Sequence, residues 1–294
     1  MKKLLLIDHN ALLHRSRSAL LRTGRQYTTA DGTPTTGVFS YINCLLSIIK
    51  SQEPTHVIVA YDAGGNVRKD VNSSYKANRG PLSEDFITEN NILKDEGHYA
   101  MGLESIGIRG IEADDILYTL SHVAQFGIDR FDEVVIATVD QDLLQCVTER
   151  CGVLLWNSTK KQQMMWVSEV REKWGCDPDD IRFIKALSGD SSDNIKGIKG
   201  VGPKTAIKIF VECNGDITEI LEHPKVKDHS ELVMNNLSLV NLRNVIGTIG
   251  PIDWSDHELG KGLEADLVDF LTKYECNSLL KRLKSIKETL RVKS

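Results

Sequence analysis

The stretch LLLIDHNALLHRSRSALLRT, residues 4–23, decides the fold class of this chain. Its first four residues are apolar and Asp8 follows them, which is the pattern of a short parallel strand buried on both faces. Leucines then recur with helical spacing, at positions 12, 13, 20 and 21. A buried strand that leads directly into a helix predicts the opening unit of an α/β fold.

The same alternation continues along the chain. Strand-like runs at 56–62 (HVIVAYD) and 132–140 (DEVVIATVD) each end in Asp, and helical patterns fill 37–52 and 112–126. A short strand is expected at 106–111. Strands that recur after helix-length crossovers are typical of a doubly wound, mostly parallel sheet, so this is the fold class that we predict.

Two segments depart from this alternation. Residues 64–97 are polar and carry charges of both signs, which predicts a loop with loosely packed helices that projects from the sheet, in the position of a substrate gate. VLLWN (153–157) and QMMWV (163–167) predict a hairpin, and helical patterns dominate beyond it. We therefore expect an α/β domain at 1–167 and a helical region at 168–294.

Composition is that of an ordinary globular chain with reduced thiols. The 294 residues include six scattered cysteines without a CxxC pair, which favours the cytoplasm over a disulfide or zinc framework. The apolar start is cut short at Asp8, and no later run approaches membrane-spanning length. The net charge of −5 argues mildly against a nucleic-acid partner, but basic residues gather at 68–79 and 196–208, and local patches matter more to a polyanion.

Nine carboxylates lie where apolar runs end or turns open. They are Asp8, Asp62, Glu112, Asp114, Asp115, Asp140, Asp142, Asp190 and Asp193. Because the strands of an open parallel sheet present their carboxyl ends at one edge, we expect most of these acids to converge there. Clustered carboxylates repel one another unless cations hold them, and oxygen-only ligands suit Mg²⁺ or Mn²⁺. Two such ions form the clamp used for phosphodiester hydrolysis, so the sequence predicts metal-dependent phosphoryl chemistry.

Three of these acids lie at the start of one predicted helix, in the motif GIEADD. Glu112 and Asp115 are three residues apart and therefore share a face of that helix, whereas Asp114 is displaced toward a second ion. A single Asp at a strand end is more often a solvated side chain or a helix N-cap. Three acids at corresponding strand ends, joined by this motif, favour metal binding.

GDSSDNIKGIKGVGPKTA, residues 189–206, is the second informative element. Its glycines are spaced like those of a Walker A loop, but Pro203 stands where the lysine must follow, and a helical pattern precedes the loop instead of a strand. A helix, a glycine-rich hairpin and a second helix that starts at Pro203 predict a helix–hairpin–helix at about 180–212. Its backbone N–H groups and lysines are expected to contact DNA phosphates without reading bases. These lysines are Lys196, Lys199, Lys204 and Lys208.

RKDVNSSYKANR, residues 68–79, places basic and aromatic side chains in the projecting segment. Lys76 and Arg79 are expected to face the acidic site, where they would position phosphate and neutralise transition-state charge. Arg68 is expected to contact DNA, and Tyr75 is expected to stack on an unpaired base.

Together these motifs resemble the flap endonuclease (structure-specific 5′-nuclease) superfamily. The resemblance is closest to the 5′–3′ exonuclease domain of bacterial DNA polymerase I and to free-standing bacteriophage flap endonucleases. It runs almost end to end, and YKANR, GIEADD and GDSSDNIKGIKGVGPKTA are highly specific in that order. The resemblance implies a PIN-like α/β core, a helical arch at about 64–97, and a C-terminal helical region that contains the helix–hairpin–helix.

The resemblance also implies roles for individual residues. A first metal site would comprise Asp8, Asp62, Glu112 and Asp114, with Asp115 close by. A second would comprise Asp140, Asp142, Asp190 and Asp193. Lys76 and Arg79 would be the catalytic basic residues of the arch, beneath which the 5′ single strand passes. The hairpin would grip duplex DNA and would bind K⁺ through its backbone carbonyls. The residues that would contact the DNA are Lys196, Gly197, Lys199, Gly200, Gly202, Lys204 and Thr205. Departures from the family pattern, at Tyr61, His9, Asn10 and Gly80, remove no ligand.

We therefore expect a nuclease that uses two Mg²⁺ ions, with Mn²⁺ as a substitute. It would cleave 5′ flaps and branched DNA, and act as a 5′–3′ exonuclease, in DNA replication and repair. The expected form is a monomer that works with a replicative polymerase in a bacterial or phage-infected cytoplasm, away from membranes.

Two alternatives stay open at this point. A PIN-type ribonuclease shares the acidic core, although the helix–hairpin–helix and the arch argue against it. A non-catalytic junction-binding protein would have lost metal ligands, and no loss is evident. A HAD-type phosphatase is excluded because its second Asp would fall at Asn10.

Overall fold

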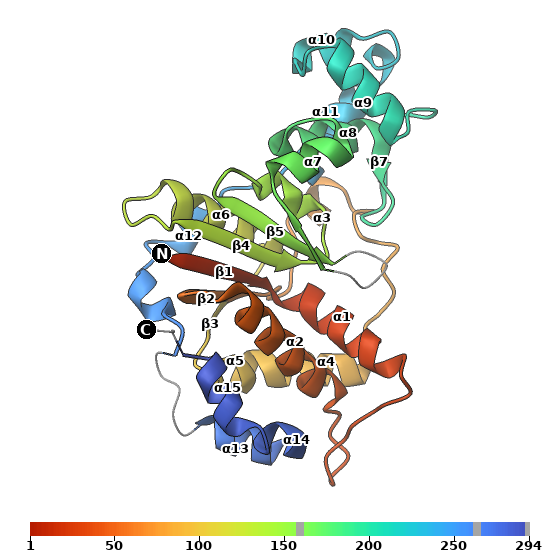
Figure 1. Ribbon diagram of the computed structural model, residues 1–294. Helices are drawn as coiled ribbons and strands as arrows, with labels where there is room; N and C mark the ends of the chain where they lie inside the picture. The colour runs from red at the N-terminus through yellow and green to blue at the C-terminus, as the bar shows by residue number, and fades with distance from the viewer. Residues whose placement is uncertain (157–161, 261–265, 292–294) are drawn as a thin grey trace.

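The computed structural model describes residues 1–156, 162–260 and 266–291, and at its centre lies a six-stranded sheet in the order β3-β2-β1-β4-β5-β6 (Figure 1). The strands are β1 (Lys3–Asp8), β2 (His56–Ala60), β3 (Glu104–Ile106), β4 (Glu133–Thr138), β5 (Cys151–Trp156) and β6 (Gln162–Met165). Neighbouring strands are parallel, except that β5 and β6 form the expected antiparallel hairpin. Position 157 of that expected hairpin lies outside the described residues. The predicted fold class is confirmed.

Alternate residues of the central strand β1 enter hydrophobic cores on opposite faces of the sheet. Leu4 and Leu6 pack in the core that includes α6, whereas Leu5 and Ile7 pack in the core that includes α1 and α2. These helices are α1 (His9–Leu21), α2 (Thr36–Gln52) and α6 (Ala113–Phe126). All four side chains are fully buried, and burying each one contributes roughly 1.5–3 kcal/mol. Because both faces are covered, the strand has no polar face, which explains its continuous apolar run.

The segment between β2 and β3 packs against α1 and α2 for part of its length. It contains α3 (Arg68–Val71), α4 (Glu84–Ile92), the π-helix η1 (Leu93–Gly97) and α5 (His98–Ala100). Phe86 and Leu93 are buried in the core of α1 and α2. The fully buried Glu89 accepts a hydrogen bond from the Gly37 N–H (2.6 Å) in the first turn of α2. The expectation that this segment projects from the sheet on loosely packed helices is therefore wrong for α4, whose Phe86 and Ile92 enter the core.

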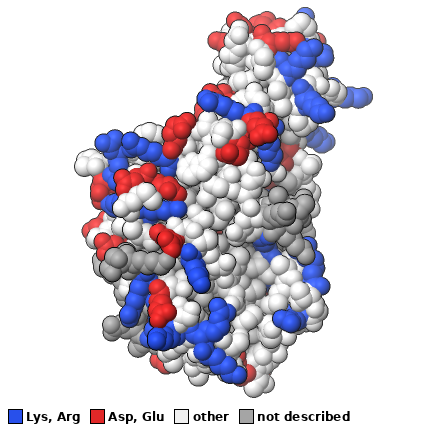
Figure 2. Space-filling model, in the orientation of Figure 1, with Lys and Arg blue, Asp and Glu red and all other residues white. Residues whose placement is uncertain are grey.

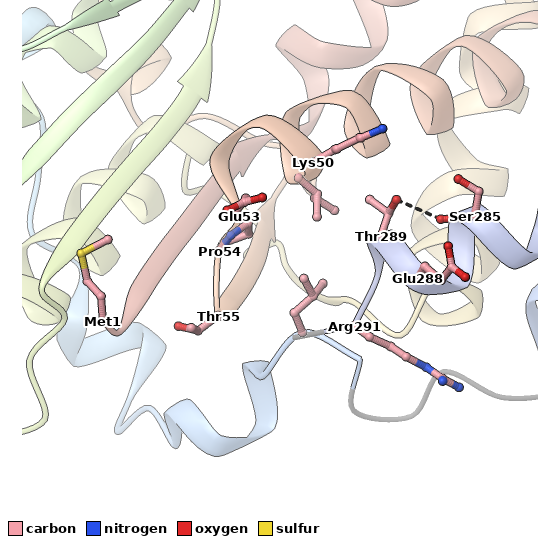
Figure 3. Close-up of a pocket in the computed structure, with 11 residues that line it drawn as sticks. Met1, Lys50, Glu53, Pro54, Thr55, Ser285, Glu288, Thr289 and Arg291 are labelled. Atoms are coloured by element: carbon pink, nitrogen blue, oxygen red, sulfur yellow. Dashed lines mark hydrogen bonds between the residues drawn. The ribbon is translucent and has the colours of Figure 1, made fainter. Parts of the chain in front are cut away.

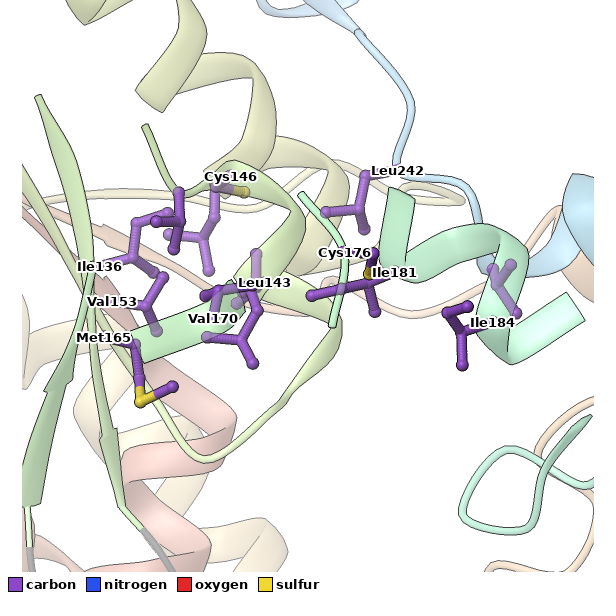
Figure 4. Packing of buried hydrophobic residues seen from close by; sticks show 14 of the residues in the cluster. Ile136, Leu143, Cys146, Val153, Met165, Val170, Cys176, Ile181, Ile184 and Leu242 are labelled. Carbon is purple, nitrogen blue, oxygen red and sulfur yellow. The ribbon is translucent and has the colours of Figure 1, made fainter. Parts of the chain in front are cut away.

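A helical region extends from the sheet beyond β6. Its elements are α7 (Val167–Trp174), η3 (Pro178–Asp180), α8 (Ile181–Ser188), β7 (Gly189–Asp190), β8 (Ile195–Lys196), α9 (Pro203–Glu212), α10 (Ile217–Glu222), η4 (Lys227–His229), α11 (Ser230–Val240) and α12 (Ile246–Ile249). Figure 4 shows Ile136 and Val153 of the sheet in the same apolar cluster as Ile181 and Ile184 of α8. The glycine-rich hairpin is thus anchored to the sheet by a continuous core. The two-residue strands β7 and β8 are exceptions to the expected loss of strands in this region.

The chain beyond position 250 first adds Trp254 to the core that includes α6, and from Leu259 onward it packs on the face of the sheet that α2 covers (Figure 1). Its elements are η5 (Trp254–His257), α13 (Asp266–Lys273), α14 (Asn277–Leu280) and α15 (Leu283–Thr289). Leu267, Leu279 and Ile286 are buried there, and Lys273 forms an ion pair with Glu96 (2.7 Å). These helices therefore stabilise the α/β core. The domain boundary expected between 167 and 168 stays a prediction.

Strand β3 ends earlier than expected. It stops at Ile106, whereas the sequence predicts a strand at 106–111. Beyond it, the Ile111 N–H donates to the Ile108 carbonyl (3.0 Å), so these apolar residues close a turn that leads into α6.

None of the helices in the described segments is long and apolar enough to cross a bilayer.

Candidate active site

Asp8, Asp62 and Asp140 lie at the carboxyl ends of three neighbouring strands. β1 ends in Asp8, while β2 and β4, which flank it, each end two residues before their Asp. The three acids therefore meet at one edge of the sheet, as the sequence predicts. Asp8 is only 5% exposed, and it accepts hydrogen bonds from the Ala11 N–H (3.0 Å) and the Thr138 hydroxyl (2.7 Å). These two contacts fix the direction of its carboxylate.

Asp62 connects the end of β2 to the start of α6. One oxygen accepts a hydrogen bond from the Ala113 N–H (2.8 Å), and the other accepts one from the Asn10 amide (3.3 Å). Ala113 is the first residue of α6, so the carboxylate also lies at the positive end of that helix. This contact brings the acids of GIEADD, Glu112 and Asp114, to the edge of the sheet.

Asp8, Asp114 and Asp140 are grouped at this edge, and no Lys or Arg of the described segments forms an ion pair with them. Burial, and then the charges of Asp140 and Asp8, raise the pKa of Asp114 well above its usual value. Burial also raises the pKa of Asp8 to about 7, and Asp62 and Asp140 add to that rise. Carboxylates that raise the pKa of one another in this way are typical of functional sites.

Replacing Asp8 by asparagine is expected to stabilise the metal-free protein at high pH. The pKa of Asp8 is about 7 in the folded protein against 3.8 in a free side chain, so the folded state binds this proton more tightly. Ionisation of Asp8 therefore costs stability progressively as pH rises from about 4 to about 7. In thermal unfolding with EDTA, Asp8→Asn should have a higher Tm than the wild type near pH 8, and a similar Tm near pH 4.

The exposed residue Asp228 supplies the control for this measurement. Asp228→Asn should change Tm equally at both pH values. If Asp8→Asn raises Tm by the same amount at both pH values, the result contradicts the raised pKa of Asp8.

Glu112 and Asp193 are held by cations of the insertion. Lys76 and Arg68 both pair with Glu112, and Arg79 pairs with Asp193 (2.8 Å). Burial alone would raise the pKa of Glu112, but Lys76 and Arg68 hold it below its usual value. The Lys76 N–H also donates to the Asp193 carbonyl (2.9 Å). Lys76 and Arg79 therefore face the acidic group, as the sequence predicts.

Lys185 lies between Asp142 and Asp190. Its ammonium contacts Asp142, in η2 (Asp142–Cys146), and lies 2.8 Å from Asp190, at the end of β7. Although burial opposes the shift, Lys185 lowers the pKa of Asp190 to about 2. Sequence reasoning missed this residue. The available signal was a lysine beside the apolar face of IRFIKALS, at 181–188, five residues before Asp190.

Asp115 belongs to a buried ion-pair cluster and not to the carboxylate edge. It is fully buried and accepts hydrogen bonds from the guanidinium groups of Arg68 (2.7 Å) and Arg243 (2.7 Å), and from the Arg243 N–H (2.9 Å). Arg68 is only 3% exposed and also donates to the Leu239 carbonyl (2.9 Å). The expectation that Arg68 contacts DNA is corrected, because its guanidinium is enclosed. Asp115 is likewise a structural partner of two arginines, and sequence reasoning missed Arg243.

Tyr75 also lies in the interior. It is 3% exposed, and its hydroxyl donates to the carboxylates of Asp193 (3.0 Å) and Glu112 (3.2 Å). The expectation that Tyr75 stacks on an unpaired base does not fit this burial. Its hydroxyl instead links the two acids.

The donor set suits divalent ions chemically. The grouped donors are carboxylates, which Mg²⁺ and Mn²⁺ prefer. Within the described ranges, however, no three Asp, Glu, His or Cys side chains are spaced to hold an ion. Lys76 separates Glu112 from Asp193, and Lys185 separates Asp142 from Asp190. The two ammonium groups therefore take the place of cations between these acids.

The glycines of the hairpin between α8 and α9 are required by its geometry. A Cβ on Gly197 would lie 2.1 Å from the Ser188 carbonyl carbon, so no side chain fits there. Gly200 has a φ of +83°, which disfavours other residues. Pro203 is the first residue of α9, as predicted. The predicted helix–hairpin–helix geometry is therefore present.

The basic residues of this hairpin reach solvent. Lys196, Lys199, Lys204 and Lys208 are exposed, as is Gly202, whereas Thr205 is half-buried. Figure 2 shows Lys and Arg side chains, in blue, along one side of the helical region that carries α9. This surface offers backbone N–H groups and ammonium groups to an anionic ligand.

Two family models match the chain. The 5′-3′ exonuclease N-terminal, resolvase-like domain matches residues 3–175, and the 5′-3′ exonuclease C-terminal SAM fold matches residues 176–250. The chain belongs to the 5′-3′ exonuclease family. The resemblance inferred from the sequence motifs is confirmed.

Two of the curated relatives are bacterial proteins. The "5′-3′ exonuclease" of Bacillus subtilis (strain 168) is 35% identical over 223 residues, which are 75% of this chain and 73% of that protein. A "DNA polymerase I, thermostable" of Thermus thermophilus is 32% identical over 292 residues, which are 95% of this chain and 33% of that protein. The chain thus spans about a third of that polymerase.

Solved structures share the fold of this 5′-3′ exonuclease family member. The T5 5′-exonuclease with bound zinc has a TM-score of 0.66 and 21% identity, and covers 99% of this chain and 100% of its own. The catalytic core of Rad2 in complex with DNA has a TM-score of 0.57 and 14% identity, and covers 93% and 88%. These neighbours support the mostly parallel core with a C-terminal helical region.

The cavity drawn in Figure 3 lies far from the carboxylates. It measures about 420 Å³ and is lined by Met1 and Thr55, which precede β1 and β2, and by Thr289 of α15. These positions lie at the amino edge of the parallel sheet, opposite the acids. This cavity therefore shares no residue with the candidate active site at the carboxyl edge.

Proposed function

We propose that this chain is a divalent-metal-dependent, structure-specific 5′ nuclease. It cleaves 5′ flaps and branched DNA by phosphodiester hydrolysis, and it also acts as a 5′–3′ exonuclease in replication and repair. The observation that carries the proposal is the convergence of Asp8, Asp62, Asp114 and Asp140 at one sheet edge, opposite Lys76. Family membership supports it.

We propose two groups of metal ligands. Asp8, Asp62, Glu112 and Asp114 would hold one ion, and Asp140, Asp142, Asp190 and Asp193 would hold the other. Mg²⁺ is the proposed ion, with Mn²⁺ as a substitute. When bound, such ions activate a water for attack on phosphorus and stabilise the leaving 3′ oxygen.

The chain's own residues would bind and orient the substrate. Lys76 and Arg79 would move from their carboxylate partners to the scissile phosphate and neutralise its charge. When Lys76 moves to the phosphate, an incoming metal cation can take its place beside Glu112 and Asp193, so these carboxylates would not be left without a counter-charge. Asn10 and Thr138 would keep the carboxylates of Asp62 and Asp8 in position through their hydrogen bonds. In this reading Asn10 aids the site, although it departs from the family pattern.

The hairpin between α8 and α9 is proposed to hold duplex DNA by its phosphates, with K⁺ bound to its backbone carbonyls. Lys196, Lys199 and Lys204 are exposed there, and the N-terminus of α9 adds unpaired N–H groups. A monomer that works with a replicative polymerase is the proposed form.

Lys199→Ala is expected to weaken duplex binding without sequence bias. The binding constant K falls as salt rises, and each lost phosphate contact makes the slope of log K against log salt less steep by about one unit. Fluorescence anisotropy with two unrelated duplexes, at several salt concentrations, measures both quantities. The exposed Lys225, outside the hairpin, supplies the control Lys225→Ala, which should change neither. A defect confined to one of the two sequences would contradict phosphate binding.

A comparison of substrates tests the proposal against the ribonuclease alternative. Matched DNA and RNA hairpins with 5′ single strands are incubated with the protein and Mg²⁺. Cleavage of the DNA with the RNA left intact supports the proposal. Preferential cleavage of the RNA would favour a PIN-type ribonuclease, and binding of DNA without cleavage would favour a junction-binding protein.

A further inference from the structure

We propose that a cleft beside the acidic group is a subsite for one unpaired nucleotide, with Trp174 as the stacking surface for its base. The cleft measures about 490 Å³ and lies between the loop after β4, the end of α7 and the hairpin that follows α8. Its size lies in the range of small-molecule sites, which is about 300–1,000 Å³. The inference rests on the proposed nuclease function, because it assigns a substrate contact to that site.

The lining of the cleft matches the two parts of a nucleotide. Val139, Trp174 and Pro203 contribute apolar surface. Arg79 and Lys185 contribute cations, and Lys185 is only 8% exposed. A nucleotide likewise has a flat apolar part, its base, beside a charged part, its phosphate. This mixture of apolar and charged surface fits a nucleotide better than an apolar peptide.

Trp174 has a fixed position and an unused donor. Its ring packs against the hydrophobic core, as does the side chain of Ile207 in α9. The Lys173 ammonium lies 5.9 Å from the ring centroid and donates to the Gln141 side chain (2.8 Å). Within the described residues, the indole Nε1 is buried and has no hydrogen-bond partner. A rigid aromatic ring offers its face as a stacking surface for an unpaired base.

An unpaired nucleotide fits this place better than a paired one. Asp140 and Asp190 line the same cleft, so a base seated on Trp174 lies next to the scissile phosphate. A base that is still paired has its partner stacked on neighbouring pairs of the duplex, whereas an unpaired base is free to stack on an aromatic ring. Stacking tolerates every base, which suits a nuclease that selects structure and not sequence.

Tryptophan fluorescence and DNA affinity test this subsite without relying on cleavage. The probes are a 5′-flap duplex, the same duplex with abasic unpaired nucleotides, and a blunt duplex, all measured with EDTA so that no strand is cut. We expect the flap with bases to quench wild-type emission more than the abasic flap, and Trp174→Phe to remove this difference. Trp174→Leu should weaken binding of the flap with bases about 5- to 100-fold and leave the blunt duplex unchanged. Trp166→Phe, outside the cleft, should behave as the wild type.

The outcomes separate this inference from the function on which it rests. The subsite is wrong, and the nuclease function stands, if the wild type binds flap DNA but shows two further results. Flaps with and without bases then quench its tryptophan emission equally, and Trp174→Leu binds the flap as tightly as the wild type does. If the wild type binds none of the three DNAs, the proposed function fails with it. Should Trp174→Leu fail to fold by circular dichroism, the comparison between the wild type and Trp174→Phe decides, because phenylalanine keeps the packing.

Discussion

Asp114→Asn is expected to lower turnover of a 5′-flap DNA at least about 100-fold while leaving DNA affinity within about two-fold. Asp114 lies in the first turn of α6, between the charges of Asp140 and Asp8, which help to raise its pKa. Asparagine has nearly the same volume but removes the charge that a catalytic cation would need. The DNA contacts proposed for the hairpin lie between α8 and α9 and at the start of α9, and Asp114 belongs to α6, so binding should persist.

Single-turnover cleavage and anisotropy with uncleaved DNA measure the two effects separately. Asp62→Asn should give the same pattern, since Asp62 is held beside Asp114 by the Ala113 N–H. The exposed Asp70, on α3, supplies the control Asp70→Asn, which should cleave at the wild-type rate. Unimpaired cleavage by Asp114→Asn would remove it from the metal site. Equal losses of binding and turnover would instead point to misfolding.

Asp115→Ala is expected to destabilise the protein by about 3–5 kcal/mol. Its carboxylate is fully buried and pairs with both Arg68 and Arg243. Removing it leaves the Arg68 guanidinium, at 3% exposure, with Glu112 and two backbone carbonyls as its partners within the described residues. A buried charge without its main partner is costly because it has lost both water and counter-charge.

Urea unfolding followed by circular dichroism measures this loss. Asp129 forms a surface ion pair with Lys2 (2.6 Å) while 66% of its side chain stays exposed, so Asp129→Ala should cost less than about 1 kcal/mol. Asp115→Ala should also keep near wild-type turnover per folded molecule at low temperature. If Asp115→Ala is as stable as the wild type but loses turnover, Asp115 belongs to the metal site after all.

The sheet and its acidic edge were predictable because local sequence determines both. Four apolar residues followed by Asp8 are typical of a strand buried on both faces, and the strand order then brings Asp62 and Asp140 alongside. The glycines at 197 and 200 were also informative, since a close approach and a positive φ each leave a mark in the sequence.

The partners of the acids were not predictable in the same way. Arg68 and Tyr75 lie in a polar segment that looks exposed, yet long-range contacts with Asp115 and Asp193 bury them. Lys185 and Arg243 reach their acids from elements that only the tertiary fold brings close. Ion pairs between distant segments leave no periodicity, so a sequence pattern alone does not reveal them.

Cleavage of a 5′-labelled flap duplex, with Mg²⁺ and with EDTA, tests the central claim most directly. The account predicts incision near the junction of single strand and duplex when Mg²⁺ is present, and none with EDTA. Incision that persists in EDTA, or binding without incision under Mg²⁺ and Mn²⁺ alike, would contradict it.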